Sequence, residues 1–281
     1  PKDLLLVDNE TLWNRYEICS TMQQTEQLLE QRSDPHRPVM FYAQPMNVHQ
    51  FARNDVPSPT AAHWQAPPGF NSRISYEVHY VDGCLGSFFK YLKQHGMYDN
   101  SIIVVASDHG DATGEFGRSS HSLIIYPEII RVPLIIHVPP AMREKLVHDD
   151  NRLSSLTDIT PSLYYLLGHR PIEHNPLFGR PLFAGTQEEL DSYRRSELFV
   201  ASDVRAAYGI LTGDGRYLYT TYDSPAESML FDLQGDPNAQ HNIVTPRLKQ
   251  TYDTKVIENL QQVADFYGYR PGVGSLLASK H

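Results

Sequence analysis

The sequence predicts an α/β fold that ends in a small antiparallel α+β subdomain. Two apolar runs of strand length, at residues 101–106 and 132–138, alternate with segments whose apolar residues recur at helical spacing. Such alternation is typical of α/β proteins. After about residue 196, strand-like runs flank a turn at residues 213–215, and this pattern predicts the antiparallel subdomain.

The first hundred residues are predicted to hold two helices and one strand. Helical spacing of apolar residues predicts a helix that ends before residue 33. Residues 39–43 form a short apolar run, so we expect a buried strand there, followed from His49 by a proline-rich loop. At residues 75–96 the apolar positions follow three- and four-residue steps, which predicts an amphipathic helix.

The central elements are two strands and a helix. Residues 101–106 are continuously apolar and β-branched, the pattern of a strand covered on both faces in a parallel sheet. Residues 132–138 predict a second strand, closed by two prolines. Residues 155–167 show helical spacing and end at a glycine, so a helix is expected there.

The C-terminal part is predicted to fold around an antiparallel sheet. A hairpin, a third strand and a closing helix are expected, in that order, at residues 207–220, 229–233 and 248–266. We therefore predict a division near residue 195. Residues 1–195 would form the α/β core, and residues 196–281 the subdomain.

The composition restricts the class of partner. The 281 residues carry a formal charge of −9, with 41% hydrophobic and 20% charged residues, as in ordinary globular proteins. This balance argues against a nucleic-acid partner, because binding to phosphate backbones needs clustered Lys and Arg. A metal cation is a more compatible partner. No apolar stretch approaches the roughly 20 residues needed to cross a bilayer, so no membrane segment is expected within this chain.

The two cysteines, Cys19 and Cys84, lie in unrelated sequence contexts. We therefore expect neither a zinc cluster nor a disulfide framework. The chain opens at Pro1 with neither a start Met nor a signal-type segment, and we expect that an upstream segment has been removed.

Asp108 and His109 follow directly on the strand predicted at residues 101–106. In doubly wound sheets, ligand-binding groups lie in loops just past the carboxyl ends of strands. An ionised carboxylate and a neighbouring imidazole can both reach one cation, and Gly110 lets the backbone turn tightly beside them. The pattern indicates a metal site, although a strand-end Asp that caps a turn beside a surface His has the same local sequence.

A longer set of motifs surrounds this pair and carries a family resemblance. Residues 107–111 read SDHGD, residues 114–117 read GEFG, and residues 126–136 read YPEIIRVPLII. These motifs resemble the downstream signature of the sulfatases within the alkaline phosphatase superfamily. Further matching pieces occur in the family's order at residues 41–49, 80–83, 157–163 and 230–242. The resemblance covers nearly the whole chain and implies an alkaline-phosphatase/sulfatase-like mixed sheet flanked by helices.

The resemblance also implies roles for particular residues. Asp108 and His109 would be two of the metal ligands, with Ca²⁺ as the most frequent ion and Mn²⁺, Mg²⁺ or Zn²⁺ as alternatives. His49 would be catalytic, donating a proton or a hydrogen bond near the leaving-group oxygen. His121 falls where many sulfatases have a Lys, and it would be catalytic and hold a sulfate or phosphate oxygen. Arg118 competes with it for this substrate-binding role.

The nucleophile of the family is not recognisable in the sequence. Sulfatases attack with a formylglycine made in a Cys-or-Ser-x-Pro-x-Arg motif, and phosphate-transferring relatives use Ser or Thr. Cys19 is followed by neither the Pro nor the Arg, so we reject it as the nucleophile. The paired acidic ligands that the family supplies near its N-terminus are also not recognisable before residue 33. Because the nucleophile is activated by the metal, we expect the chain alone to bind the cation weakly and to be inactive.

The expected function is therefore metal-dependent hydrolysis of sulfate esters by the intact protein, which a missing N-terminal segment of the same polypeptide would complete. Two alternatives remain open. The first is a phosphoethanolamine or phosphoglycerol transferase or a phosphodiesterase of the same superfamily. The second is a non-catalytic, sulfatase-like binding domain that senses a lipid or a protein. The resemblance by itself implies a periplasmic or other extracytoplasmic location.

Overall fold

The structure is a computed structural model that describes residues 17–52, 64–121, 125–169, 179–202, 206–222 and 228–268. The chain forms two compact units, Pro1–Ser101 and Ile102–His281. The predicted division near residue 195 stays a prediction. No helix within the described ranges is both long and apolar enough to span a bilayer.

The first unit holds α-helices and a short 3₁₀ helix, and the second holds all the strands of the described residues. The elements of the first unit are α1 (Ile18–Glu30), α2 (Asn47–Ala52), α3 (Ser72–Gln94) and η1 (Tyr98–Asn100). Those of the second are β1 (Ile103–Ala106), β2 (Ala112–Thr113), η2 (Glu115–Gly117), β3 (Ser119–Ser120), α4 (Pro127–Ile130), β4 (Leu134–His137), α5 (Pro140–Arg143), β5 (Val147–His148), η3 (Leu156–Asp158), α6 (Ile159–Leu166), β6 (Phe183–Ala184), α7 (Gln187–Ser192), β7 (Glu197–Ser202), β8 (Ala207–Thr212), β9 (Tyr217–Tyr222), β10 (Met229–Asp232) and α8 (Pro246–Tyr267).

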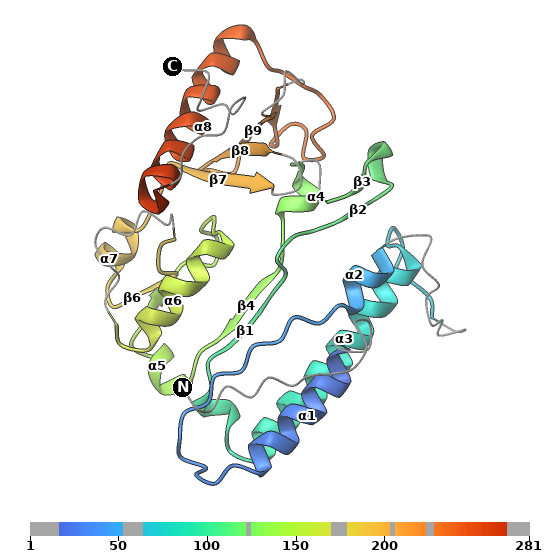
Figure 1. Ribbon diagram of the computed structural model, residues 1–281, viewed down its shortest axis with the longest axis vertical. Helices are drawn as coiled ribbons and strands as arrows, with labels where there is room; N and C mark the ends of the chain where they lie inside the picture. The colour runs from blue at the N-terminus through green and yellow to red at the C-terminus, as the bar shows by residue number, and fades with distance from the viewer. Residues whose placement is uncertain are drawn as a thin grey trace. The chain divides into compact units, whose positions relative to one another are not determined.

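In the first unit, α1 packs along α3 (Figure 1). Both predicted helices are thus confirmed. Glu17 caps α1 by accepting hydrogen bonds from the backbone N–H groups of Cys19 and Ser20, and Asn71 caps α3 in the same way. A disulfide joins Cys19 to Cys84, whose Cα atoms lie 5.0 Å apart. The expectation of no disulfide was wrong, because helix packing brings together cysteines whose spacing in sequence gives no sign of it.

A buried polar group lies where α2 meets the two long helices. The Asn47 side chain accepts a hydrogen bond from the backbone N–H of Ile18 at 3.0 Å and also hydrogen-bonds Glu77 of α3. Glu77 is only 2% exposed. Burial raises the pKa of the Glu77 carboxyl, the charge of Glu17 raises it further, and the hydrogen bond with Asn47 opposes both effects.

The buried strand predicted at residues 39–43 was wrong. No strand pairing involves these residues within the part of the chain that the structure describes, and Met40 and Tyr42 are 88% and 77% exposed. A short apolar run favours burial only if other elements cover it, and sequence periodicity does not reveal whether they do. His49 lies in the short helix α2 rather than in the expected loop, and its side chain is exposed.

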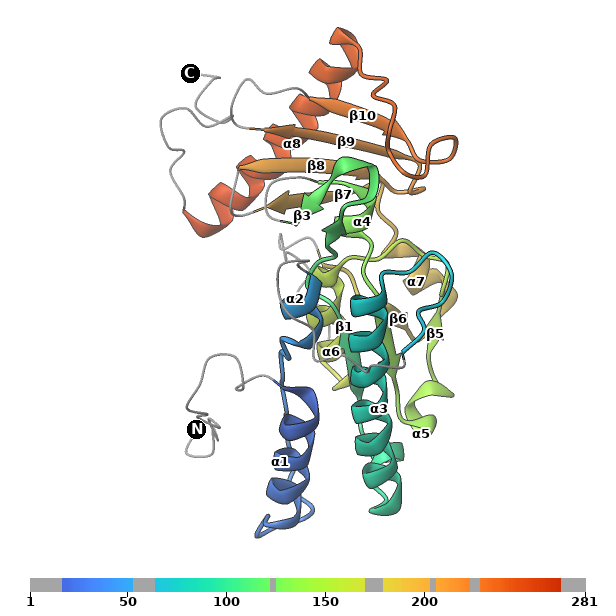
Figure 2. The same ribbon diagram turned by 90° about the vertical axis from the view of Figure 1, so that its right-hand side faces the viewer.

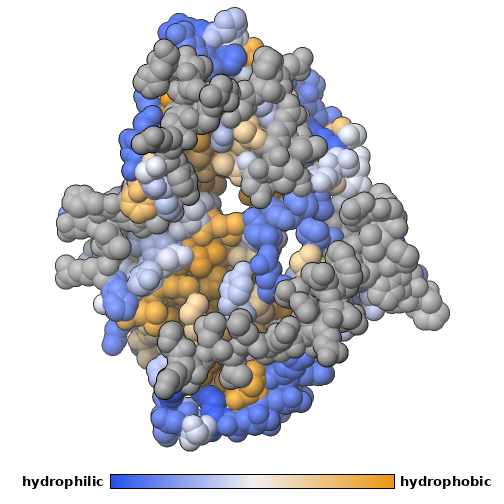
Figure 3. Space-filling view, viewed as in Figure 1, coloured by the Kyte–Doolittle hydropathy of each residue, from blue (hydrophilic) through white to orange (hydrophobic). Residues whose placement is uncertain are grey.

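In the second unit, β1 and β4 form an antiparallel pair with Val104 opposite Ile136. Both strands were predicted, but the parallel, fully covered arrangement of β1 was wrong. Residues 103–105 are half-buried and Ala106 is exposed, and the chain between the strands returns through a hairpin and α4 instead of a crossover helix. Such a connection produces antiparallel neighbours. Apolar residues gather at the surface around β4 and α6 (Figure 3), where Ile135, Tyr164 and Leu167 are more than half exposed.

The C-terminal sheet is antiparallel with the order β10-β9-β8-β7 (Figure 2). The predicted hairpin, third strand and closing helix are confirmed as β8, β9, β10 and α8, and β7 was not anticipated. One face of the sheet packs through Tyr219 against Val256 of α8. The other face packs through Leu218 against Ile125, just before α4. The sheet therefore supports the segment that follows the β2–β3 hairpin.

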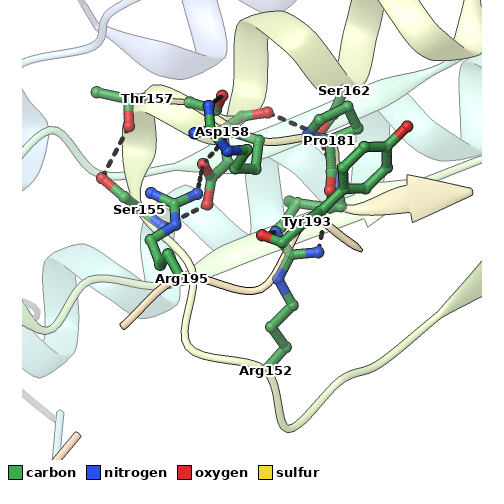
Figure 4. A network of polar contacts seen from close by, with 11 residues as sticks. Arg152, Ser155, Thr157, Asp158, Ser162, Pro181, Tyr193 and Arg195 are labelled. Atoms are coloured by element: carbon green, nitrogen blue, oxygen red, sulfur yellow. Dashed lines mark hydrogen bonds and ion pairs between the residues drawn. The ribbon is translucent and has the colours of Figure 1, made fainter. Parts of the chain in front are cut away.

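Asp158 is fully buried just before α6 (Figure 4). Its carboxylate forms an ion pair with Arg195 and accepts hydrogen bonds from the backbone N–H groups of Ser155 at 2.9 Å and Arg180 at 2.7 Å. Its backbone carbonyl accepts from the Ser162 hydroxyl at 2.6 Å. These contacts join the start of α6 to the segments at residues 180 and 195.

Candidate metal centre

Asp108 and His109 lie directly after β1, at the carboxyl end of that strand, as predicted. The Asp108 Oδ2 and His109 Nε2 atoms are 3.8 Å apart, and the side chains are 63% and 31% exposed. The His109 Nδ1 atom lies 2.8 Å from the backbone carbonyl oxygen of Gly110. A carbonyl oxygen only accepts, so Nδ1 donates this hydrogen bond, and in the neutral ring the lone pair is then on Nε2, the atom that faces Asp108.

Gly110 fits this loop because no side chain has room there. A Cβ atom at this position would lie 2.0 Å from the carbonyl oxygen of Glu128, and the Gly110 N–H donates to the carbonyl of Ile129 at 2.7 Å. The backbone of Gly110 is therefore pressed against α4. The reason for the glycine is this close approach of two backbones, and not the left-handed conformation that often requires one.

His121 is brought back to this loop by the β2–β3 hairpin. The ladder pairs Ala112 with Ser120, and the next positions outward are Asp111 and His121. The Asp111 Oδ1 and His121 Nδ1 atoms are 3.5 Å apart, and both side chains are mostly buried. The His121 ring stacks on the His109 ring with centroids 3.9 Å apart. The Asp111 carboxylate and the His109 and His121 rings thus lie together at the candidate centre. Asp108 lies beside His109.

The tip of the hairpin is closed by Glu115. Its carboxylate accepts hydrogen bonds from the backbone N–H of Thr113 at 2.7 Å and from the Thr113 hydroxyl at 2.5 Å. Partial burial raises the pKa of Glu115, but these hydrogen bonds outweigh that effect and the pKa is lowered. Glu115 therefore stays ionised and holds the turn that separates β2 from β3.

Arg118, the other predicted substrate-binding residue, has both terminal nitrogens hydrogen-bonded within the protein. Its Nη1 donates to both carboxylate oxygens of Glu128, at 2.9 and 3.2 Å, and to the carbonyl of Asn238 at 2.9 Å. Its Nη2 donates to the carbonyl of Ala239 at 2.5 Å. The guanidinium lies 3.7 Å from the centre of the Tyr126 ring. These contacts disfavour Arg118 as a ligand of an oxyanion.

The residues present fit part of a divalent-metal site. Oxygen and nitrogen ligands lie about 2.0 to 2.6 Å from such ions, so a single ion can bridge atoms 3.8 Å apart. The His109 Nε2 atom has the lone pair that coordination needs, and the hydrogen bond from Nδ1 to a carbonyl is the outer contact that metal-binding histidines usually make. Asp108 and His109 supply fewer ligands than any divalent ion takes in proteins.

Two other sequence assignments concern residues of the first unit. His49 is an exposed residue of α2, and its predicted catalytic role stays a prediction. The sulfur of Cys19 is bonded to Cys84, which agrees with rejecting Cys19 as a nucleophile.

Sequence reasoning missed the partners that orient the predicted residues. Asp111 was read only as part of the SDHGD motif, and Glu128 only as part of the later motif. The spacing of the hairpin offers a signal for the first. Gly114 and Gly117 predict a turn between residues 111 and 121, which brings these two residues to the same end of the hairpin. No comparable signal links Arg118 to Glu128 or to Ala239.

Residues 5–169 match the Sulfatase family, and since this match spans more than half of the chain, the protein belongs to that family. It is similar to a Delta 4,5-hexuronate-2-O-sulfatase of Bacteroides thetaiotaomicron, with 25% identity over 74% of this chain and 43% of the relative. It is also similar to lipoteichoic acid synthase 1 of Bacillus subtilis, with 28% identity over 56% of this chain and 25% of the relative. The chain spans less than half the length of either relative.

Solved structures confirm the fold. A putative sulfatase from Bacteroides fragilis has a TM-score of 0.57 at 19% identity, covering 87% of this chain and 58% of that one. A phosphonate monoester hydrolase of Agrobacterium radiobacter has a TM-score of 0.52 at 23% identity, covering 68% and 41%. At these identities the likeness establishes the alkaline-phosphatase/sulfatase fold, as expected from the sequence motifs.

Proposed function

We propose that the protein is a metal-dependent hydrolase of sulfate esters in which Asp108 and His109 bind the metal and His121 binds an oxygen of the ester group. The observation that carries this proposal is the geometry after β1, where the Asp108 Oδ2 and His109 Nε2 atoms lie 3.8 Å apart and the Nε2 lone pair is fixed by the hydrogen bond to Gly110. Membership of the Sulfatase family supports it.

The residues around the pair fit distinct tasks. A divalent ion bound there would polarise the ester and stabilise charge on its oxygens. Ca²⁺ is the first candidate because of the family resemblance, and the carboxylate oxygen suits it. The imidazole nitrogen favours a transition metal, so Mn²⁺ or Zn²⁺, together with Mg²⁺, are the alternatives. His121 is oriented by Asp111 and by stacking on His109, so it can donate a hydrogen bond to an ester oxygen as charge develops. His49 remains our candidate for protonating the leaving group.

The remaining ligands and the nucleophile would come from elsewhere in the protein. Contrary to expectation, the Cys-or-Ser-x-Pro-x-Arg pattern occurs once, at Ser33-Asp34-Pro35-His36-Arg37, but these residues lie in an exposed turn after α1. We do not assign the nucleophile to them, and the relatives are more than twice as long as the matched part. We therefore propose that residues 1–281 alone are inactive. We also propose an extracytoplasmic location, which the Cys19–Cys84 disulfide supports because such bonds persist in oxidising compartments.

The test is an assay of the intact protein with an aryl sulfate in the presence of Ca²⁺ or Mn²⁺. Asp108→Ala is expected to lower the rate by about 10³-fold or more, because it removes a metal ligand. Asp150→Ala is the matched control. Asp150 also pairs with a histidine, because its Oδ1 atom lies 3.5 Å from the Nε2 atom of His148, and this exposed pair lies at the end of β5 and not after β1. Equal rates for wild type and Asp108→Ala would contradict the proposal.

A phosphate ester is the second candidate substrate, and the similarity to lipoteichoic acid synthase 1 favours it over a non-catalytic role. The same metal ligands and His121 would serve either ester. The assay is therefore repeated with an aryl phosphate diester under the same conditions. A larger specificity constant for the diester than for the sulfate would transfer the proposal to the phosphodiesterase or transferase class.

A further inference from the structure

The backbone on both sides of Arg118 adopts positive φ angles, which non-glycine residues do not favour. Among the residues that the structure describes, the non-glycine residues with positive φ are Phe116 at 55°, Ser120 at 70° and Ala239 at 52°. Phe116 and Ser120 lie two residues before and after Arg118, and Ala239 supplies a carbonyl to which Arg118 donates. Such conformations persist only where the surrounding contacts hold them.

The contacts of Arg118 are of the kind that can hold this loop. Its guanidinium joins the loop to Glu128 at α4 and to the carbonyls of Asn238 and Ala239 in the turn after β10. The side chain is 11% exposed, so water competes little for these hydrogen bonds. The backbone carbonyl of Arg118 also accepts a hydrogen bond from the N–H of Gly114 at 2.9 Å, and this bond closes the turn between β2 and β3.

The position of His121 depends on this loop. Ser120 immediately precedes His121, so a change in the Ser120 dihedral angles would move the His121 ring away from Asp111 and from its stack on His109. The ladder between β2 and β3 is only two residues long on each strand. It is too short to fix the loop by itself.

We propose that Arg118 is a positioning residue that sets the place of His121 by binding Glu128 and the turn at residues 238–239. The C-terminal subdomain thereby contributes to the geometry of the ester-binding side of the centre. This inference rests on the proposed function, in which His121 binds an oxygen of the ester. It replaces the direct role in substrate binding that the sequence suggested for Arg118.

The first experiment compares Arg118→Lys with Arg216→Lys in the intact protein. Lysine keeps the charge but cannot reach one carboxylate and two carbonyls in separate directions. Arg216 is the matched control, because it also forms an ion pair with a carboxylate, Asp232, and lies over a ring, Tyr217. We expect Arg118→Lys to lower kcat/KM for the aryl ester about tenfold and Arg216→Lys to leave it unchanged. Equal effects of the two variants would overturn the proposal.

A double-mutant cycle separates positioning from general stability. His121→Ala removes the residue through which Arg118 is proposed to act, so adding Arg118→Lys to it is expected to cause no further loss of kcat/KM. If Arg118 acted only on stability or bound the substrate itself, the two losses would multiply. Multiplying losses would overturn the proposal.

A spectroscopic measurement keeps the inference testable if the protein proves inactive on the esters. The ring signals of His121, recorded by NMR on histidine-labelled chain 1–281, are expected to shift in Arg118→Lys and not in Arg216→Lys. Should Arg118→Lys fail to fold, Ser120→Val disturbs the same loop, since a β-branched residue is strained at this φ, while Ser120→Gly accommodates it. His121 signals unchanged in Arg118→Lys, or in Ser120→Val where that variant is needed, would overturn the proposal.

Discussion

Two aspartates of the second unit, Asp158 and Asp108, differ in their surroundings, and the surroundings of a carboxylate determine whether it stabilises the fold or is available to a ligand. Asp158 is fully buried, and its oxygens accept from two backbone N–H groups and from Arg195. The Asp108 side chain is 63% exposed, and its Oδ1 atom accepts a hydrogen bond from the backbone N–H of His109 at 3.1 Å. The two residues have the same chemistry and opposite environments.

The difference teaches how to separate a structural acid from a metal-ligand candidate. A carboxylate whose oxygens are already satisfied by protein donors gains nothing from a cation and holds its segment in place. A carboxylate with solvent-facing oxygens beside an imidazole lone pair can exchange water for a metal ion at little cost. The comparison predicts large effects on stability at the first residue and small ones at the second.

The largest expected effect is the destabilisation of the chain by Asp158→Asn. The amide cannot neutralise Arg195, whose side chain is 15% exposed, so a mostly buried charge loses its partner. Breaking a pair of this kind costs about 3–5 kcal/mol in free energy of unfolding. Denaturant unfolding of the chain measures the change. A loss below about 1 kcal/mol would show that Asp158 does not hold α6 in place.

Much of the fold could be predicted because its elements carry strong local patterns. The apolar steps at residues 75–96 and the turn at residues 213–215 predicted α3 and the β8–β9 hairpin, and both are present. The buried strand predicted from the apolar run at residues 39–43 was wrong, because local composition does not say whether another element covers a segment. The direction of β1 was wrong for a related reason, since pairing depends on the connection between strands.

The candidate centre was predicted only in part. The motif placed Asp108 and His109 together, and the structure places the Asp108 Oδ2 and His109 Nε2 atoms 3.8 Å apart. The contacts that orient His121 could not be read directly from the sequence, because Asp111 faces it through the register of a hairpin and Arg118 reaches a turn 120 residues away. Long-range pairs of this kind arise from packing and leave no local pattern.

Glu77 in the first unit sharpens the comparison, because it is a buried carboxylate with few donors. Burial raises its pKa above the ordinary value of 4.5, so the folded state binds the proton more tightly than the unfolded state. The stabilising contribution of Glu77 is therefore complete below about pH 4.5 and is lost as the pH rises through the folded-state pKa. Above its folded-state pKa the buried carboxylate is ionised and costs stability.

Glu77→Gln is consequently expected to raise the free energy of unfolding by up to about 1 kcal/mol at pH 8 and to give no gain at pH 4. Denaturant unfolding at the two pH values measures the difference. Glu30→Gln, at an exposed position of α1, is the control and should change little at either pH. A gain of equal size at both pH values would mean that the charge of Glu77 is not the cause.

The smallest expected effect on stability is that of Asp108→Asn. In the absence of metal, an exposed side chain of this kind changes the free energy of unfolding by less than about 0.5 kcal/mol. The contrast appears when a cation is added to the intact protein. An ion present at ten times its dissociation constant stabilises the wild type by about 1.4 kcal/mol, and the variant should gain much less. Thermal unfolding with and without Mn²⁺ measures both values. A loss of several kcal/mol without metal would place Asp108 with Asp158 as a structural acid, because the exposed carboxylate would then be fixing the loop itself.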